Sequence, residues 1–250
     1  MAASHPGHSA SPAALFRDPV SGPTLYIINA SDLKPLSTEN KLSLYADDTS
    51  LLVPEKSPIS VNCELENVKS WSTDNKLVIN IKKTKQLIFR RPNLSSSSMP
   101  VLIPDLEYVD SVKLLGVFVN STFNLTEHVD FILKICSQRF YLLKLLRQNG
   151  LCSRRLDWVF SALVVSRVNY AIEAWGGFLS KLAIGKINKM FKKARRWGLC
   201  TKNYNFDEIQ DKACDRLFFK ARNFRNHCLS HLLPPVRDIP YNLRTRIHDL

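Results

Sequence analysis

The chain has 250 residues, a formal net charge of +13 and 45% apolar side chains. This composition is ordinary for a folded globular protein and excludes wholesale disorder. No stretch approaches the roughly 20 uncharged apolar residues that a bilayer span requires, and the N-terminus lacks the charged-then-apolar layout of a secretory signal. We therefore expect an intracellular protein, in the nucleus or the cytoplasm, with no membrane partner.

The six cysteines are scattered along the chain and form no C-x-x-C pair. Six cysteines in a chain of this length are too sparse for a disulfide scaffold. The sequence therefore predicts reduced, mostly buried thiols and no disulfide-linked partner.

The positive charge is concentrated in one half of the chain. Residues 1–124 hold 12 Lys/Arg and 12 Asp/Glu, whereas residues 125–250 hold 23 Lys/Arg and 10 Asp/Glu. This asymmetry predicts two modules with different partners. A basic module favours a polyanion, either nucleic acid or an acidic membrane surface, and we favour nucleic acid. The alternative is a solvated, lysine-rich helical surface.

The composition and the spacing of apolar residues in the N-terminal region change near residue 21. Residues 1–20 are rich in Ala, Ser, Pro and His and show no periodicity, which predicts a disordered head. Ser21-Gly22-Pro23 is typical of a helix start. An apolar face made by Leu25, Ile28 and Leu33 then predicts a helix that ends before Pro35.

Two short segments around a pair of aspartates predict a β-hairpin. Residues 41–46 and 49–53 suit strands, and Asp47-Asp48 between them would form a two-residue turn. Adjacent carboxylates at the tip of a hairpin repel each other, and a hard divalent cation with oxygen ligands would relieve that repulsion. Mg²⁺ would also suit phosphate chemistry. The alternative is a hydrated Asp-Asp turn.

The next segments predict one helix and several strands. Ser57-Pro58 is a second helix start, and Val61, Leu65, Val68 and Trp71 follow at amphipathic spacing. Two strands are predicted before a surface loop over residues 91–100, and two more are predicted after it. The predicted strands are residues 77–79, 86–89, 106–109 and 112–119.

From Thr126 onward the pattern is helical. The first predicted helix ends at Asn149-Gly150, a typical C-cap. The others run from Ser153 to Gly176, from Ser180 to Gly198, and from Asp207 towards Pro234. The order of elements therefore predicts an α+β fold class, with an α/β part followed by an all-α part.

The third of these helices is strongly basic. Between residues 181 and 197 there are seven cations and no acid, and at 100° per residue the cations fall within one half of the helix. Like charges four residues apart are unfavourable unless something neutralises them. Phosphate groups would do so, giving affinity and salt dependence without sequence choice. The predicted nucleic-acid-binding residues are Lys186, Lys189, Lys192, Lys193, Arg195 and Arg196.

The hairpin segment Leu-Tyr-Ala-Asp-Asp-Thr-Ser-Leu-Leu-Val, residues 44–53, resembles the Y-x-D-D hairpin of reverse transcriptases. The agreement extends to both sides and keeps its order over about residues 21–200. Residues 21–33 resemble the helix before the hairpin, residues 71–84 the next motif, residues 113–117 the strand pair called the primer grip, and residues 151–199 the thumb. Together these motifs resemble non-LTR (LINE-type) retrotransposon reverse transcriptases.

The resemblance implies part of a right-hand polymerase fold. Residues 21–124 would form a partial palm, an antiparallel sheet with helices on one face, and residues 125–250 a basic helical thumb or connection. The reaction of the family is the template-directed addition of a deoxynucleotide to a primer 3′-hydroxyl. It uses two Mg²⁺ ions, for which Mn²⁺ can substitute. The implied partners are an RNA template, a DNA primer and deoxynucleotides.

The resemblance also implies roles for individual residues. Asp47 would bind metal and Asp48 would assist, while Lys83 would lie near the departing pyrophosphate. A second group would bind primer and substrate. In that group Gly22 would let the backbone approach the nucleotide, Tyr45 would lie under the primer end, and the residues supporting the primer strand would be Lys113 and Gly116.

The chain departs from the family pattern before the Gly-Pro helix. The family palm takes a third carboxylate from an earlier strand, and only Asp18, with no strand pattern around it, stands upstream of Gly22. The fingers are also missing. We therefore expect an RNA-directed DNA polymerase fragment that is inactive by itself. The alternatives are a non-catalytic remnant that binds nucleic acid through the basic helical half, and a structural relic with neither activity.

Overall fold

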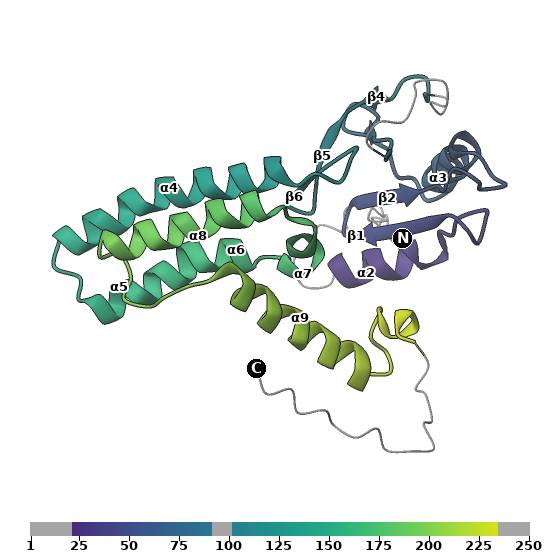
Figure 1. The fold of residues 1–250 in the computed structure, drawn as a ribbon. Helices are drawn as coiled ribbons and strands as arrows, with labels where there is room; N and C mark the ends of the chain where they lie inside the picture. Colours follow the sequence, from purple (N-terminus) through teal and green to yellow (C-terminus); the bar gives the residue numbers. More distant parts are fainter. Residues whose placement is uncertain (1–21, 92–101, 235–250) are drawn as a thin grey trace, which may run out of the picture. The chain divides into compact units, whose positions relative to one another are not determined.

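The computed structural model describes residues 22–91 and 102–234. The chain divides into two compact units, Met1–Val112 and Lys113–Leu250 (Figure 1). The predicted head, residues 1–20, and most of the predicted loop over 91–100 lie outside the described residues. The predicted boundary lies between residues 124 and 125. The observed division instead assigns Lys113 and Gly116 to the helical unit.

The first unit begins with the predicted helix, α2 (Gly22–Asn29), which continues as a short 3-10 turn, η1 (Ala30–Asp32). The predicted apolar face is only partly correct, because Leu33 is buried whereas Ile28 is 63% exposed. The predicted hairpin follows as β1 (Lys41–Tyr45) and β2 (Asp48–Leu52), which pair antiparallel.

The second helix of this unit is α3 (Val61–Asp74). Its N-cap is Ser60, whose side chain accepts a hydrogen bond from the Cys63 N–H, so the helix begins later than the predicted Ser57-Pro58 start. The predicted apolar residues of α3 are only half-buried. Polar contacts hold this helix to the preceding loop instead: the Trp71 indole donates to Asp32 at 2.9 Å, and Asn67 donates to the Lys34 carbonyl at 3.0 Å.

Glu64 of α3 is the centre of these polar contacts, and its side chain is fully buried. Its carboxylate accepts hydrogen bonds from the backbone N–H of Leu36 at 3.0 Å, from that of Ser37 at 3.1 Å, and from the Asn40 amide at 2.7 Å. Burial alone would raise the pKa of Glu64, but the three hydrogen bonds outweigh burial and lower it. A buried carboxylate therefore fixes the loop between α2 and the hairpin.

The remaining strands are short and do not join the hairpin in one sheet. β3 (Lys85–Gln86) pairs parallel with β4 (Glu107–Tyr108), and β5 (Ser111–Leu114) pairs with β6 (Val117–Asn120). The prediction of a single strand over 112–119 was therefore wrong, since a tight turn divides it. The predicted strand over 77–79 is irregular chain. Among the described residues the strands form three separate two-stranded sheets rather than one palm sheet.

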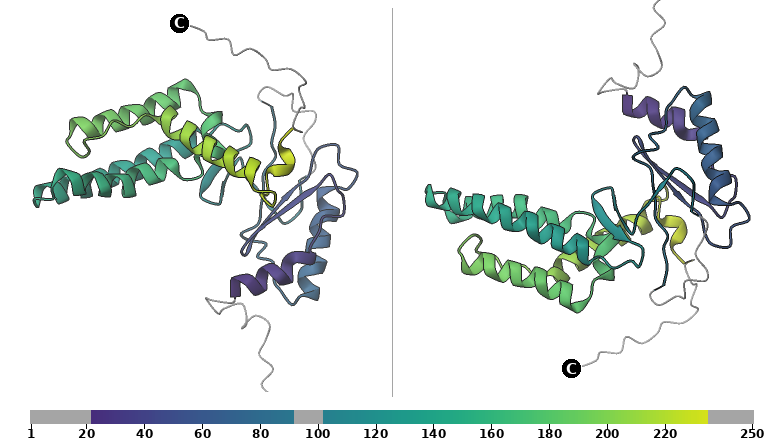
Figure 2. Two further views of the ribbon diagram at one scale, coloured as in Figure 1. Left: turned by 90° about the horizontal axis from the view of Figure 1, so that it is seen from below. Right: turned by 90° about the horizontal axis from the view of Figure 1, so that it is seen from above.

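The second unit is a helical bundle with one shared core. Its long helices α4 (Thr126–Gln148) and α8 (Lys181–Arg196) lie side by side, as both views in Figure 2 show. α5 (Ser153–Phe160) packs on α4, and α9 (Phe206–Asn223) is followed by a 3-10 turn, η5 (Ser230–Leu232). The fully buried large side chains of this core are Val129, Leu143, Leu156, Phe160, Val164, Val168, Ile172, Trp175, Ile187, Leu199 and Phe206.

The predicted helix from Ser153 to Gly176 is broken into several pieces. After α5 come a π-turn, η3 (Ser161–Val165), and two short helices, α6 (Ser166–Asn169) and α7 (Ile172–Trp175), before a 3-10 turn, η4 (Gly176–Phe178). The guanidinium of Arg139 donates to the Leu163 carbonyl within the π-turn. Ala171, with a φ of 50°, separates α6 from α7. Apolar residues continue to recur at helix-like spacing through this segment, so the breaks are recognised from the backbone conformation.

The fold class is mixed α+β, with helices dominating the described residues. No helix in the described part of the chain has both the length and the apolarity to cross a membrane. All six cysteines are free, as predicted. The expectation of mostly buried thiols was wrong, because only Cys136 and Cys200 are buried; burial raises the pKa of each to about 11.

Candidate functional site

The two aspartates of the hairpin do not share the turn. Tyr45 pairs with Asp48, so the first strand ends and the second begins one residue earlier than predicted, and the turn is Ala46-Asp47. Ala46 has a φ of 50°, a left-handed conformation that two-residue hairpin turns demand. Asp48 is therefore the first residue of β2, and Asp47 occupies the turn.

The surroundings of the aspartates are open. Both side chains are exposed, and Tyr45 is 65% exposed. Burial raises the pKa of Tyr26 in α2, and the negative charge of Asp47 raises it further. The helix that begins at Gly22 thus neighbours the hairpin. A small cavity of about 200 Å³ lies between them and is lined by Tyr26, Ile27, Ala30, Ser31, Leu44 and Ala46.

The geometry around Asp47 and Asp48 does not supply a metal site by itself. Among the described residues there is no group of three or more His, Cys, Asp or Glu side chains that could hold a metal ion. Lys83 is exposed in a turn where its N–H contacts the Asn80 side chain, and no hydrogen bond or ion pair in the described chain joins it to either aspartate. A site for two Mg²⁺ ions needs carboxylates that both ions share, and two carboxylates are too few for that. The residues around the hairpin therefore do not fit the pair of Mg²⁺ ions that the resemblance implies.

Of the two predicted primer-supporting residues, Lys113 lies in β5 and Gly116 lies in the tight turn that follows it. Leu115 and Gly116 connect β5 and β6 with φ values of 45° and 90°. The Tyr170 hydroxyl donates to the Leu115 carbonyl at 2.8 Å, and a Cβ on Gly116 would lie only 3.2 Å from the Tyr170 ring. Beside this turn, the Lys113 ammonium lies 5.0 Å from the centre of the Phe131 ring. A hydrogen bond therefore joins the primer-grip turn to Tyr170, 55 residues further along the chain, within the helical unit.

The basic helix has the amphipathic form that its sequence predicts. Ser180 caps α8 by accepting a hydrogen bond from the Ala183 N–H. One face is buried in the core and the cations lie on the other, while Leu182 is 75% exposed. The buried residues of α8 are Ala183, Ile187, Met190, Phe191 and Ala194, and the exposed cations are Lys181, Lys189, Lys192, Lys193, Arg195 and Arg196.

Few acidic groups balance these cations. Only Lys186 forms an ion pair among the described residues of α8, with Asp130 at 2.9 Å. The Lys193 ammonium lies 4.4 Å from the centre of the Trp197 ring, which positions the charge but does not neutralise it. Over residues 131–206 the sequence holds 15 Lys/Arg and only 2 Asp/Glu. One of those two acids, Asp157, is buried and accepts a hydrogen bond from the Thr201 N–H at 2.7 Å.

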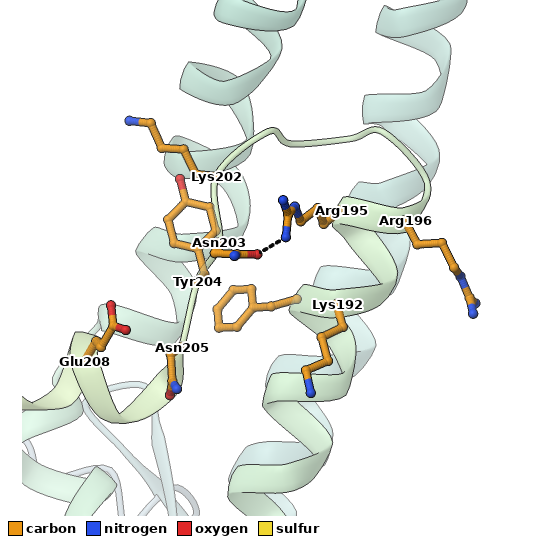
Figure 3. A pocket seen from close by; sticks show the side chains of 9 residues that line it. Lys192, Arg195, Arg196, Lys202, Asn203, Tyr204, Asn205 and Glu208 are labelled. Carbon is orange, nitrogen blue, oxygen red and sulfur yellow. Dashed lines mark hydrogen bonds between the residues drawn. The ribbon is translucent and has the colours of Figure 1, made fainter.

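A pocket of about 720 Å³ opens beside the C-terminal half of α8 (Figure 3). One side is α8, and the other is the loop 202–205 with the first turn of α9. Figure 3 shows Arg195 pointing towards the loop, where it donates to the Asn203 side chain at 2.5 Å, while Arg196 extends away from it. The lining residues are Phe191, Lys192, Arg195, Arg196, Lys202, Asn203, Tyr204, Asn205 and Glu208.

The pocket combines predicted and unpredicted residues. Sequence reasoning identified Lys192, Arg195 and Arg196 but missed Lys202 and Asn203, which lie beyond the helix. A cation and an amide shortly after a basic helix were the available signal. The chain reversal that brings them back to α8 is visible only in the structure.

Comparisons with protein-family models, with curated proteins and with solved structures return no match. The function proposed for this chain therefore depends on the geometry of its two units and on the sequence resemblance.

Proposed function

We propose that this chain is a fragment derived from a non-LTR reverse transcriptase, and that its own activity is to bind the sugar–phosphate backbone of nucleic acid. The observation that carries the proposal is the exposed half of α8, which presents a row of cations with one ion pair among them. The resemblance supplies the expected partner, an RNA template paired with a DNA primer.

The binding would depend on charge rather than on base sequence. Lysine and arginine side chains on a helix surface contact phosphates, and phosphate contacts position a protein without reading bases. Each neutralised phosphate releases counterions, so affinity falls steeply as salt rises. The buried face of α8 anchors the row of cations to the bundle core, which holds them in a fixed array.

The proposal predicts a strong effect of charge reversal on α8. Replacing Lys189 and Lys193 by glutamate in the full chain is expected to weaken binding to an RNA–DNA duplex by about tenfold or more at 0.1 M salt. The slope of log affinity against log salt should fall by about 2, one for each phosphate that is no longer neutralised. Fluorescence anisotropy over a KCl series measures both quantities.

The matched control is the same charge change on α9, at Lys212 and Lys220, which are equally exposed. These substitutions should change affinity much less. Binding by the native chain that shows no salt dependence, or an equal decrease in affinity in both double variants, would contradict a phosphate-binding role for α8. No duplex binding at all would leave the structural relic as the remaining interpretation.

The second candidate function is polymerase activity of this chain alone. The features that favour it are the hairpin with Asp47 in its turn and the neighbouring helix α2. We expect no template-dependent synthesis with Mg²⁺ or Mn²⁺, because two carboxylates lack the further ligand. The loss of one transition-state charge stabiliser typically costs on the order of 10²- to 10³-fold in rate. Primer extension with the native chain and with Asp47→Asn measures this. Synthesis that the substitution abolishes would establish a working enzyme.

A further inference from the structure

We infer that the pocket between α8 and the loop 202–205 is a preformed site for a backbone phosphate of a bound nucleic-acid strand, with Arg195 as its central ligand. This inference rests on the proposed function and names one place on the binding surface where a phosphate would be held. It adds residues from outside the basic helix, Lys202 and Asn203, to the binding surface.

The charge of the pocket favours an anion. Four of its nine lining residues are cations and one, Glu208, is an acid. Three of these cations come from α8 and Lys202 comes from the loop. In Figure 3 Arg195 points across the pocket towards the loop, whereas Arg196 and Lys202 extend away from Arg195. The net positive charge of the lining raises the local concentration of phosphate groups, and Arg195 is the cation that points into the pocket.

The loop that forms the second wall is anchored along its length. At its start, Thr201 is held by the buried carboxylate of Asp157. At its end, the Phe206 N–H donates to the Asn188 side chain on α8 at 2.9 Å. Between these points the Tyr204 ring packs against core aromatic rings, 5.5 Å from Phe160 between ring centres. The pocket therefore exists before a ligand arrives, which reduces the entropy cost of binding.

Arg195 is oriented for a phosphate. The Asn203 side-chain oxygen accepts a hydrogen bond from one guanidinium nitrogen of Arg195 at 2.5 Å. A guanidinium has five N–H donors, so others stay available for a bidentate contact with phosphate oxygens. Asn203 is neutral and fixes the side chain without cancelling its charge. We therefore assign Asn203 a positioning role.

The pocket suits a phosphate better than a base. A base in such a site would stack on an aromatic ring, and the candidates are Tyr204 and Phe191. Phe191 is 2% exposed, and the two rings pack against each other with centres 5.6 Å apart. Phe191 therefore has no ring face to offer, and the half-buried Tyr204 ring is already packed against Phe191 and Phe160. The guanidinium, ammonium and amide groups are the better contacts for a ligand.

Two single substitutions in the full chain test the inference. Lys202→Ala is expected to weaken binding to an RNA–DNA duplex by about three- to tenfold and to reduce the salt slope by about 1. Asn203→Asp keeps the shape of the side chain but places a carboxylate against Arg195, so affinity should fall by about tenfold. Lys212→Ala removes an exposed cation outside the pocket and should change affinity little.

The outcomes separate this inference from the proposed function. Thermal unfolding monitored by circular dichroism must show that each variant remains folded. If both pocket variants bind the duplex like Lys212→Ala while the α8 charge reversal weakens it, the pocket is overturned and the proposed function stands. If the native chain binds no duplex, the proposed function is overturned, and the pocket assignment is overturned with it. Pocket-dependent binding to phosphatidylserine vesicles instead of duplex, or displacement of duplex by equimolar tripolyphosphate, would also overturn the assignment to a nucleic-acid strand.

Discussion

Replacing Glu64 by leucine is expected to lower the free energy of unfolding of the first unit by about 3–5 kcal/mol, because two backbone N–H groups and the Asn40 amide lose their acceptor inside the protein. Each buried donor left unsatisfied costs about 1–3 kcal/mol. A domain stability of about 5–15 kcal/mol leaves little margin for such a loss. Hydrogen exchange at the amides of Leu36 and Ser37 measures the effect directly, since both donate to this carboxylate.

Glu66→Leu is the matched control, two residues along the same helix. Glu66 is exposed and forms an ion pair with Lys69 at 2.7 Å, an interaction worth about 0–1 kcal/mol. Equal protection of Leu36 and Ser37 in both variants would contradict the role of Glu64. The folded-state pKa of Glu64 is lowered from 4.5, so its contribution is present above pH 4.5 and is lost as the pH falls through the lower folded value.

Trp175→Ala is expected to destabilise the helical unit by about 3–5 kcal/mol, as large-to-small changes of buried aromatic residues do. Trp175 is completely buried, its indole donates to the Tyr170 carbonyl at 2.9 Å, and its ring centre lies 5.8 Å from that of Phe206. The substitution also removes the packing of the indole against the buried His128 ring, 4.9 Å away between centres. Urea unfolding followed by circular dichroism measures the loss of stability.

Trp158→Ala provides the comparison, because Trp158 is 61% exposed and the Arg154 guanidinium lies 5.4 Å from its ring centre. Its cost should stay below about 1 kcal/mol. A similar urea midpoint for both variants would show that Trp175 is not central to the core. Since α8 takes its orientation from that core, loss of the core in Trp175→Ala should also abolish duplex binding at temperatures where the native chain still binds.

Short-range patterns predicted much of the local structure correctly. The Ser180 cap, the end of α4 at Asn149-Gly150 and the division of α8 into an apolar and a cationic face all depend on residues within one or two helical turns. The hairpin was predicted for the same reason. Its exact turn was not, because whether Asp47-Asp48 or Ala46-Asp47 forms the connection depends on the pairing register of the two strands.

Long-range polar contacts could not be predicted from the sequence pattern. No role for Glu64 follows from the pattern, since an acid on an amphipathic helix normally faces water, and its acceptance of the Leu36 N–H 28 residues away follows only from how the loop folds back. The interruption of the helix after Phe160 was not predicted either. The buried residues Phe160, Val164 and Val168 recur every four residues, a spacing that one face of an α-helix also allows, so the apolar pattern gives no sign of the π-helix.

The position of the positive charge, the helix that carries it and the segment that forms the Y-x-D-D hairpin can all be predicted from neighbouring residues, because each depends on local spacing. Three contacts are seen in the folded chain alone: Asn203 orients Arg195, the Tyr170 hydroxyl donates to the Leu115 carbonyl, and Lys202 lines a pocket together with the end of α8. The physical reason is that chain reversals create these contacts, and a reversal depends on which apolar faces find burial together rather than on any local pattern.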